Sequence, residues 1–285
     1  MNTYLEPHPI VVGVEDDEPA SLRYAIAEAE RLGCGVRVVH VFEVTGNPGA
    51  AEPAEWVSAC RESASSVLDR ARKLVDYLDS DVPVEYVLYD GRTEDVLVQL
   101  SAKARMIVLG PDDASWRELL FKGHISRRLA QEAWCPVVVV PPDWDADQKG
   151  SVIVTLDNTT TAYGPLRFAF DTANHRHSPL RALNVTPVAA SSRASELRRQ
   201  SIDDLLGDWA EDYPQVPVWT EIQVGEVAER VKAAIRDAVL VVVGRPHHHS
   251  VLASGWASEA DNLITEPLCP VAVVPSTYSG RPVRN

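Results

Sequence analysis

The sequence predicts an α/β fold in two copies, each a doubly wound, parallel five-stranded sheet flanked by helices. Three observations lead to this prediction. The 285 residues are enough for two ordinary domains, short apolar runs alternate with helical patterns, and motifs recur at one constant separation. The recurring motifs are Val82-Pro83-Val84 with Val216-Pro217-Val218, Gly91 with Gly225, Gly110 with Gly244, Cys135-Pro136-Val137 with Cys269-Pro270-Val271, and Pro141 with Pro275.

The strands of the first copy are predicted from short apolar runs. Their continuous hydrophobic character is typical of parallel strands that are buried on both faces. Between them lie longer segments with helical spacing, so the order of elements favours a parallel sheet with right-handed crossovers. The predicted strands are residues 10–14, 36–42, 82–88, 106–109 and 136–140.

The helices are predicted from apolar stripes at helical spacing. One stripe runs from Leu22 to Leu32 and stops at Gly33, and a second runs from Leu68 to Leu78. Two shorter helices are expected further along the copy. The third covers Thr93–Ala102 and buries Val96, Leu97 and Leu100, and the fourth lies within Ile125–Ala133.

A linker is predicted where the two copies meet. Residues 141–150 contain prolines, acids and a glycine, with no apolar period. We therefore expect one domain over residues 1–146 and a second over residues 147–285.

The charge balance argues against two classes of partner. Asp and Glu number 41 against 27 Lys and Arg, which gives a net charge of −14. A chain this acidic is not expected to bind nucleic acid or anionic membranes over a general surface. No apolar stretch approaches the roughly 20 residues that span a bilayer, and residues 1–9 lack a signal-peptide pattern, which predicts a cytoplasmic location.

The cysteine and histidine spacings indicate no metal site. No two of the four cysteines form a C-x-x-C pair, and Cys135 and Cys269 each precede a proline at the start of a predicted strand. That position favours small buried side chains. His247, His248 and His249 suggest a metal site, but three successive residues do not easily converge on one ion. We expect a solvated polar loop there.

The ends of the predicted strands are where a ligand is expected, because doubly wound sheets bind ligands beyond the carboxyl ends of their strands. Here the order and spacing of several features, seen twice, resemble a tandem universal stress protein. These features are the strand-end residues, the Ala-rich first helix and the Cys-Pro-Val strand entry. The resemblance covers nearly the whole chain and implies an adenine-nucleotide-binding, Rossmann-like fold. The strand-end residues are Glu15, His40-Val41 and Gly110 in the first copy and Asp157, Asn184-Val185 and Gly244 in the second.

The resemblance also implies how ATP would bind, since some members of the family bind ATP and others do not. Binding members carry a glycine, two residues, a second glycine, nine residues, and then Gly-Ser or Gly-Thr. These glycines let backbone N–H groups approach the phosphates. The strand-one carboxylate is implied to hold ribose or a metal, and the backbone of the strand-two valine to meet adenine.

Both copies depart from this glycine pattern. In the first, Asp113 stands at the second glycine position and His124 follows Gly123, so the acidic loop would repel phosphate. In the second, His247 takes the second glycine position and Ala257-Ser258 the last, and the loop is neutral to basic. ATP binding is therefore not expected in the first copy and stays open in the second. The candidate binding residues are Asp157, Val185, Gly244, His247, Ala257 and Ser258 in the second copy, and Glu15, Val41, Gly110, Gly123 and His124 in the first.

No catalytic motif accompanies these residues. The sequence lacks a G-x-S-x-G elbow, a G-x-x-x-x-G-K-[ST] loop and a G-x-G-x-x-G fingerprint, and His40 fits a packed or hydrogen-bonded strand residue better than a catalytic base. The favoured hypothesis, implied by the resemblance, is a cytoplasmic stress-response module that binds or regulates without turnover. The alternative is a nucleotide-binding protein, with ATP chiefly in the second copy and weak or no hydrolysis. A hydrolase built on the same sheet is a third hypothesis.

The resemblance further implies that the fifth strands pair. Val137–Val140 and Val271–Val274 are expected to pair within the chain, which would make it a pseudo-dimer and cover edges that otherwise promote aggregation. A homo-oligomer and a regulatory protein partner stay open.

Overall fold

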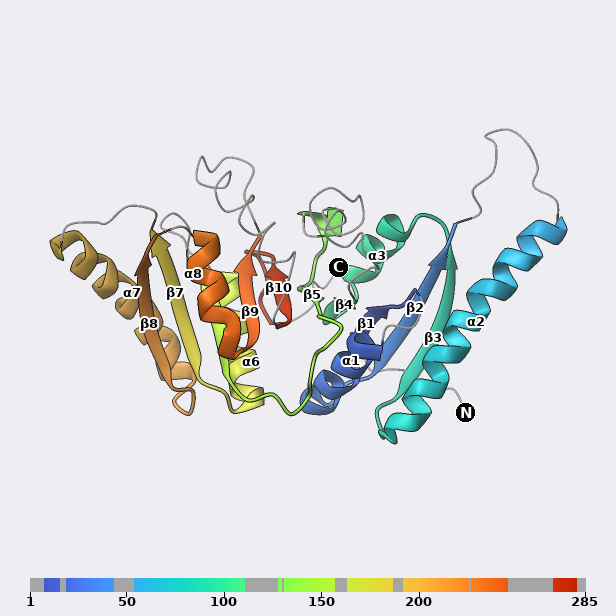
Figure 1. Ribbon diagram of the computed structural model, residues 1–285, viewed down its shortest axis with the longest axis horizontal. Coiled ribbons are helices and arrows are strands. Elements are labelled where there is room, and N and C mark those ends of the chain that lie inside the picture. The colour runs from blue at the N-terminus through green and yellow to red at the C-terminus, as the bar shows by residue number, and fades with distance from the viewer. Residues whose placement is uncertain are drawn as a thin grey trace. The chain divides into compact units, whose positions relative to one another are not determined.

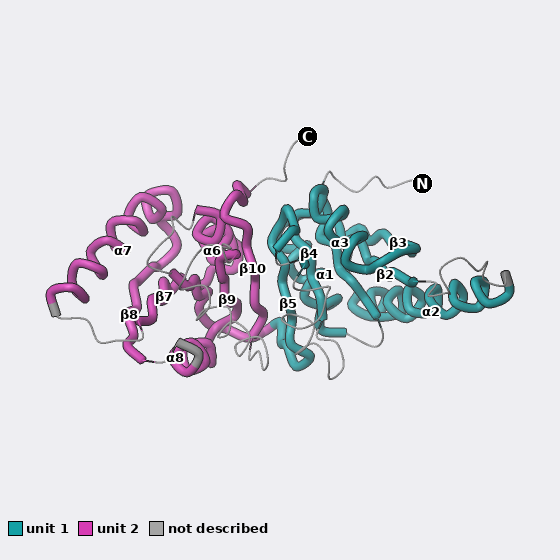
Figure 2. The backbone as a smooth tube through the Cα atoms, turned by 90° about the horizontal axis from the view of Figure 1, so that it is seen from above, with its two compact units in different colours: residues 1–146, 282–285 teal, residues 147–281 magenta. Residues whose placement is uncertain are grey.

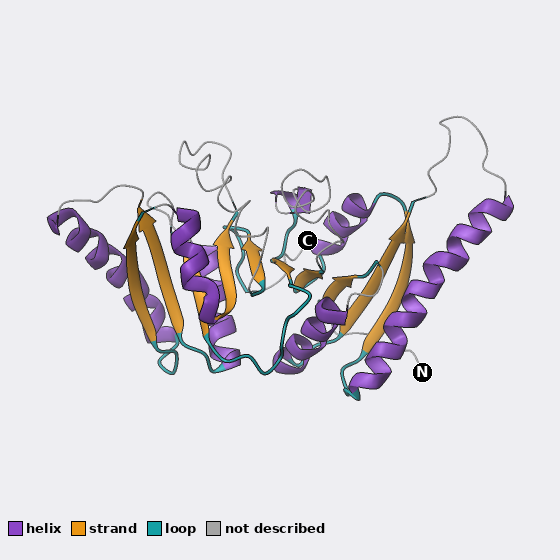
Figure 3. Cartoon of the chain, in the orientation of Figure 1, coloured by secondary structure: helices purple, strands orange, loops and turns teal. Residues whose placement is uncertain are grey.

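Helices and strands alternate through the chain, which divides into two compact units between residues 146 and 147 (Figures 2 and 3). The computed structural model describes residues 8–15, 19–43, 54–110, 128–129, 131–156, 163–186, 192–225, 227–245 and 269–280.

The first unit is a five-stranded sheet in which every neighbouring pair of strands is parallel (Figure 1). Its strand order is β3-β2-β1-β4-β5. Its elements are β1 (Ile10–Gly13), α1 (Pro19–Leu32), β2 (Val36–Phe42), α2 (Ala54–Leu78), β3 (Val84–Asp90), α3 (Thr93–Ser101), β4 (Met106–Leu109) and β5 (Val137–Val139).

The second unit repeats this sheet with the order β8-β7-β6-β9-β10, again parallel throughout. The predicted fold of two repeated, parallel five-stranded sheets is therefore confirmed. The elements are β6 (Ser151–Thr155), α6 (Tyr163–Arg176), β7 (Leu180–Thr186), α7 (Ser192–Asp212), β8 (Val218–Val224), α8 (Val227–Ala234), the 3-10 helix η1 (Ile235–Asp237), β9 (Ala238–Gly244) and β10 (Val271–Val274).

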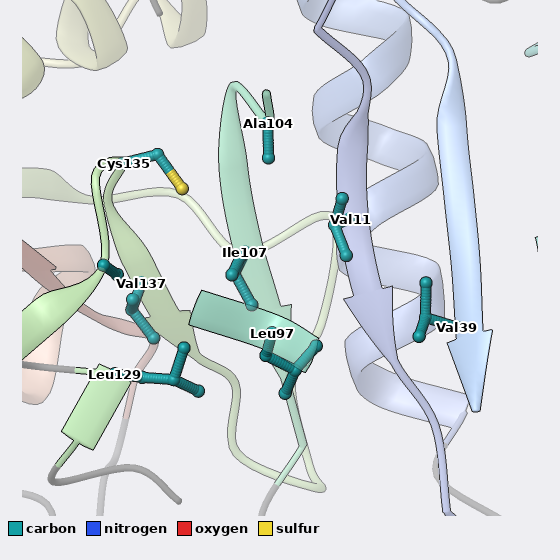
Figure 4. Close-up of a cluster of buried hydrophobic side chains, with 9 residues drawn as sticks. Val11, Val39, Leu97, Ala104, Ile107, Leu129, Cys135 and Val137 are labelled. Atoms are coloured by element: carbon teal, nitrogen blue, oxygen red, sulfur yellow. The ribbon is translucent and has the colours of Figure 1, made fainter. Parts of the chain in front are cut away.

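One face of the first sheet packs against α3 and the segment before β5 (Figure 4). Leu97 of α3 and Leu129 form a buried cluster with Val11, Val39 and Ile107 of three neighbouring strands. All five side chains are at most 1% exposed. The continuous apolar runs of β1 and β4 follow from this arrangement, because each central strand has helices on both faces.

Helix α3 buries less than the sequence predicts. Leu97 is buried, but Val96 and Leu100 are only half-buried, because a short helix turns one narrow stripe towards the sheet. Of the predicted fourth helix, residues 128–129 and 131–132 are helical and Ala133 is not, and residues 125–127 and 130 lie outside the described residues. Among the described helices, none has both the length and the hydrophobicity that a bilayer crossing requires.

The segment after β5 is anchored, which the prediction of a plain linker missed. It has no helix or strand, as expected, but Trp144 is buried and its ring meets Tyr24 of α1 edge-on at 5.2 Å between centroids. The second unit repeats this contact after β10, where Tyr278 meets Phe168 of α6 at 5.7 Å. We call Trp144 and Tyr278 the aromatic anchors. The backbone N–H of each donates to the proline carbonyl three residues earlier. In each unit, an aromatic residue that follows the fifth strand therefore packs on the first helix.

The two strand-entry cysteines are buried, as predicted. Cys135 is 3% exposed and Cys269 is 1% exposed. Burial raises the pKa of the Cys269 thiol to about 12. Both side chains therefore behave as small apolar residues at the start of their strands.

Candidate functional site

The strand order reverses beside the first strand of each unit. β1 lies between β2 and β4, and β6 lies between β7 and β9. In doubly wound sheets this switch point, at the carboxyl ends of the strands, is where ligands bind. Glu15 and Gly110 follow the ends of β1 and β4, and Gly244 ends β9.

At this edge β2 extends past the end of β1. The register of the two strands ends with Gly13 opposite Val39, and one further bond runs from the Val14 N–H to the Val39 carbonyl at 2.9 Å. Odd-numbered residues of β2 thus turn their backbone groups towards β1. Val41 is the next such residue, and its N–H and C=O lie beyond the last register pair that β1 offers in the described chain.

The second unit repeats this arrangement. The register of β6 and β7 ends with Thr155 opposite Leu183, and the Leu156 N–H then donates to the Leu183 carbonyl at 2.9 Å. Val185 occupies the place of Val41, past the last register pair of the described β6. Val185 is buried, whereas Val41 is half-buried.

In both units, a side chain from the second strand binds the first backbone carbonyl past the end of the first strand. His40 Nδ1 lies 2.7 Å from the Val14 oxygen, and Asn184 Nδ2 lies 2.8 Å from the Leu156 oxygen. Since a carbonyl can only accept, each nitrogen is the donor. We call His40 and Asn184 the strand-end donors. The prediction that His40 is a hydrogen-bonded strand residue is confirmed.

Comparison with known proteins identifies the family. The model of the universal stress protein family matches residues 7–141 and again residues 150–275. The chain belongs to the universal stress protein family. It is a tandem member, since two matches fill most of its length.

Relatives of this universal stress protein have a similar length. A universal stress protein of Mycobacterium tuberculosis is 27% identical over 263 residues, which cover 86% of this chain and 89% of the relative. One from Mycolicibacterium smegmatis is 26% identical over 282 residues, covering 93% and 96%. The crystal structure of a universal stress protein from Archaeoglobus fulgidus is similar in fold, with a TM-score of 0.69, 16% identity, and coverage of 92% and 95%.

The universal stress protein brings part of the predicted site together. Glu15, Val41 and Gly110 lie at the strand ends of the first unit, and Val185 and Gly244 at those of the second. Glu15 and Gly244 are exposed, and Gly110 is half-buried. The remaining candidates lie outside the described residues: Asp157, His247, Ala257, Ser258, Gly123 and His124.

Sequence reasoning placed Asn184 at a strand end but did not select it as a site residue. It is 1% exposed and makes the same contact as His40, and each of the two residues directly precedes the strand-end valine of its copy. That shared position was the available signal, because a histidine and an asparagine share a side-chain N–H donor at a comparable reach.

In the first unit of this universal stress protein, charged side chains near the carboxyl ends of the strands form ion pairs. Arg92 pairs with Glu94, and Arg128 pairs with both Asp95 and Glu132. Glu94 and Asp95 lie in the first turn of α3, which starts at the carboxyl end of β3. These two arginines therefore already have carboxylate partners. Within the described residues, no group of three or more His, Cys, Asp or Glu side chains is placed to hold a metal ion.

Proposed function

We propose that this tandem universal stress protein is a cytoplasmic regulatory module that binds an adenine nucleotide, with ATP as the test ligand, in its second unit and does not turn it over. The observation that carries the proposal is the position of the Val185 peptide past the end of β6. Its N–H and C=O have no register partner left in the described part of that strand.

The edge of adenine suits such a peptide group. Adenine presents an amino donor beside ring-nitrogen acceptors. A backbone C=O can accept from the amino group, and a backbone N–H that points the same way can donate to a ring nitrogen. Val185 is buried, and hydrogen bonds are electrostatically stronger away from water. Gly244 ends β9 on the other side of β6, where the lack of a side chain lets backbone approach a phosphate.

Charge favours the second unit over the first. The first-unit loop carries Asp112 and Asp113, and each unit charge about 4 Å from a phosphate costs about 1 kcal/mol even in water. Arg92 and Arg128 cannot offset this repulsion without leaving their carboxylate partners. The corresponding loop of the second unit is neutral to basic and follows Gly244 with Arg245.

Binding without turnover is the simplest activity for these residues. His40, the histidine at the described edge, has Nδ1 engaged by the Val14 carbonyl, as a structural residue would. The sequence also has no recognised nucleophile or phosphate-loop motif.

Calorimetric titration of the full chain with Mg-ATP tests the proposal, with Asp157→Ala and Glu15→Ala as a matched pair at equivalent positions. We expect one site per chain, and a loss of about tenfold or more in affinity for Asp157→Ala, because a hydrogen bond to a charged group is worth about 1.5–3 kcal/mol. Glu15→Ala should bind like wild type. No heat and no thermal stabilisation at millimolar ATP would contradict nucleotide binding, and an equal loss in both variants would contradict the choice of the second unit.

Phosphate release by the same samples tests the absence of turnover. We expect release no faster than in buffer. Release that Asp157→Ala abolishes would show that the second unit hydrolyses ATP, which is the alternative function.

A further inference from the structure

We infer that the strand-end donors His40 and Asn184 keep the backbone N–H groups of Val41 and Val185 available for a ligand. Each donor occupies the carbonyl just past the end of the first strand, which the valine N–H would otherwise take. They are positioning residues, since they act through the valine peptide. The ligand in this inference rests on the proposed function, but the effect on the free protein does not.

The ladder geometry identifies the competing bond. In a parallel pair, a residue of one strand donates to one carbonyl of its neighbour and accepts from the N–H two residues further along. Val14 donates to Val39, so the regular partner of the Val14 oxygen is the Val41 N–H. That oxygen instead receives His40 Nδ1 at 2.7 Å. The side chain thus ends the ladder one bond early.

In the second unit, too, a side chain takes the place of the valine N–H at this carbonyl, but the side chain is an asparagine and not a histidine. Leu156 donates to Leu183, which makes the Val185 N–H the regular partner of the Leu156 oxygen. Asn184 Nδ2 takes that oxygen at 2.8 Å. An imidazole and a carboxamide differ in shape and charge, and what they share here is an N–H donor aimed at one carbonyl.

A purely structural role would make a different prediction. If the donor only satisfied an otherwise unpaired carbonyl, its loss would loosen the strand end and speed amide exchange there. If it holds the carbonyl away from the ladder, its loss lets the valine N–H form the regular bond. Exchange at that one amide would then become slower. The two explanations therefore predict opposite signs.

The test is amide hydrogen exchange by NMR on the full chain without ligand, comparing wild type with Asn184→Ala. We expect the Val185 amide to exchange about tenfold more slowly in the variant, and Mg-ATP affinity to fall by about tenfold or more. Asn184→His, which installs the donor of the first unit, should restore both values towards wild type.

The first unit provides the second pair of variants, because His40 is half-buried and tolerates replacement more easily than the buried Asn184. His40→Ala should slow exchange at Val41, and His40→Asn, which copies the second unit, should not. Nitrogen shifts of the wild-type His40 ring should show the proton on Nδ1, since that atom donates to Val14.

The outcomes separate the inference from the proposed function. Unchanged or faster exchange at Val185 and Val41 in the alanine variants overturns the inference, even if nucleotide binding is lost. Slower exchange in a protein whose wild type binds no nucleotide supports the role of the donors and refutes the proposed function.

Discussion

Replacing Trp144 with alanine should destabilise the first unit, although the residue lies in a segment without regular structure. Its side chain is 5% exposed, and its ring packs on Tyr24, which is fully buried. The Arg23 guanidinium also donates to the Trp144 carbonyl at 3.4 Å. The anchor is therefore joined to α1 by both ring packing and a hydrogen bond.

The size of the effect follows from this burial. Truncating a buried tryptophan to alanine costs about 3–5 kcal/mol, and a loop that relaxes into the space brings the loss to the lower end. We expect about 3 kcal/mol. For a unit of this size, each kcal/mol lowers the melting temperature by roughly 2–4 °C, so the first unit should melt roughly 6–12 °C lower.

Urea denaturation followed by far-UV circular dichroism measures the loss. Trp134→Ala is the control, because Trp134 is 57% exposed and its removal should change stability by about 0.5 kcal/mol at most. If both substitutions change the free energy of unfolding by the same small amount, the reasoning is refuted and the segment is a plain linker.

Three further predictions concern other parts of the chain. Tyr213→Phe should cost about 1–2 kcal/mol at neutral pH, because the Tyr213 hydroxyl donates to Asp171 at 2.5 Å. Burial, and then the Asp171 contact, raise the pKa of Tyr213 above its ordinary 10.0. The free energy of unfolding of the wild type should therefore fall as pH rises above about 10, and that of the variant should fall less. Urea titrations at each pH measure both. Gly225→Ala should cost about 1–3 kcal/mol by the same assay, since φ there is 141° and a Cβ would lie 2.8 Å from a guanidinium nitrogen. Cys60 is half-buried and Cys269 is 1% exposed with a raised thiol pKa, so mass spectrometry after brief alkylation at pH 8 should find the label on Cys60 and not on Cys269.

The fold was predictable because the repeat and the apolar periodicity each extend over whole helices and strands. Gly91 and Gly225 recur at one separation, and both hold positive φ after equivalent edge strands. The anchors were not predictable in this way. Trp144 and Tyr278 differ in sequence, and only the fold brings each onto its first helix. The pairing of the fifth strands stays a prediction.

The candidate site was predictable only in part, for a physical reason. Sequence patterns identify strand ends, so Glu15 and Val185 could be placed at the ligand edge. Which backbone groups lack a partner in the hydrogen-bond ladder depends on how many residues one strand extends beyond the end of its neighbour. That number follows from the register of the two strands, which the structure gives and sequence patterns do not. The contact between Asn184 and Leu156 depends on the same register.

The anchors also offer a way to locate the ligand. Each unit has its own sheet and its own anchor, so a substitution at Trp144 should lower the transition of the first unit and leave that of the second isolated at higher temperature. A ligand that binds only the folded second unit stabilises that unit by about 2.7 kcal/mol at a concentration of 100 times Kd. In Trp144→Ala, Mg-ATP should therefore raise the upper transition alone. A rise in the lower transition would place the nucleotide in the first unit, because the folding equilibrium responds only where the ligand binds.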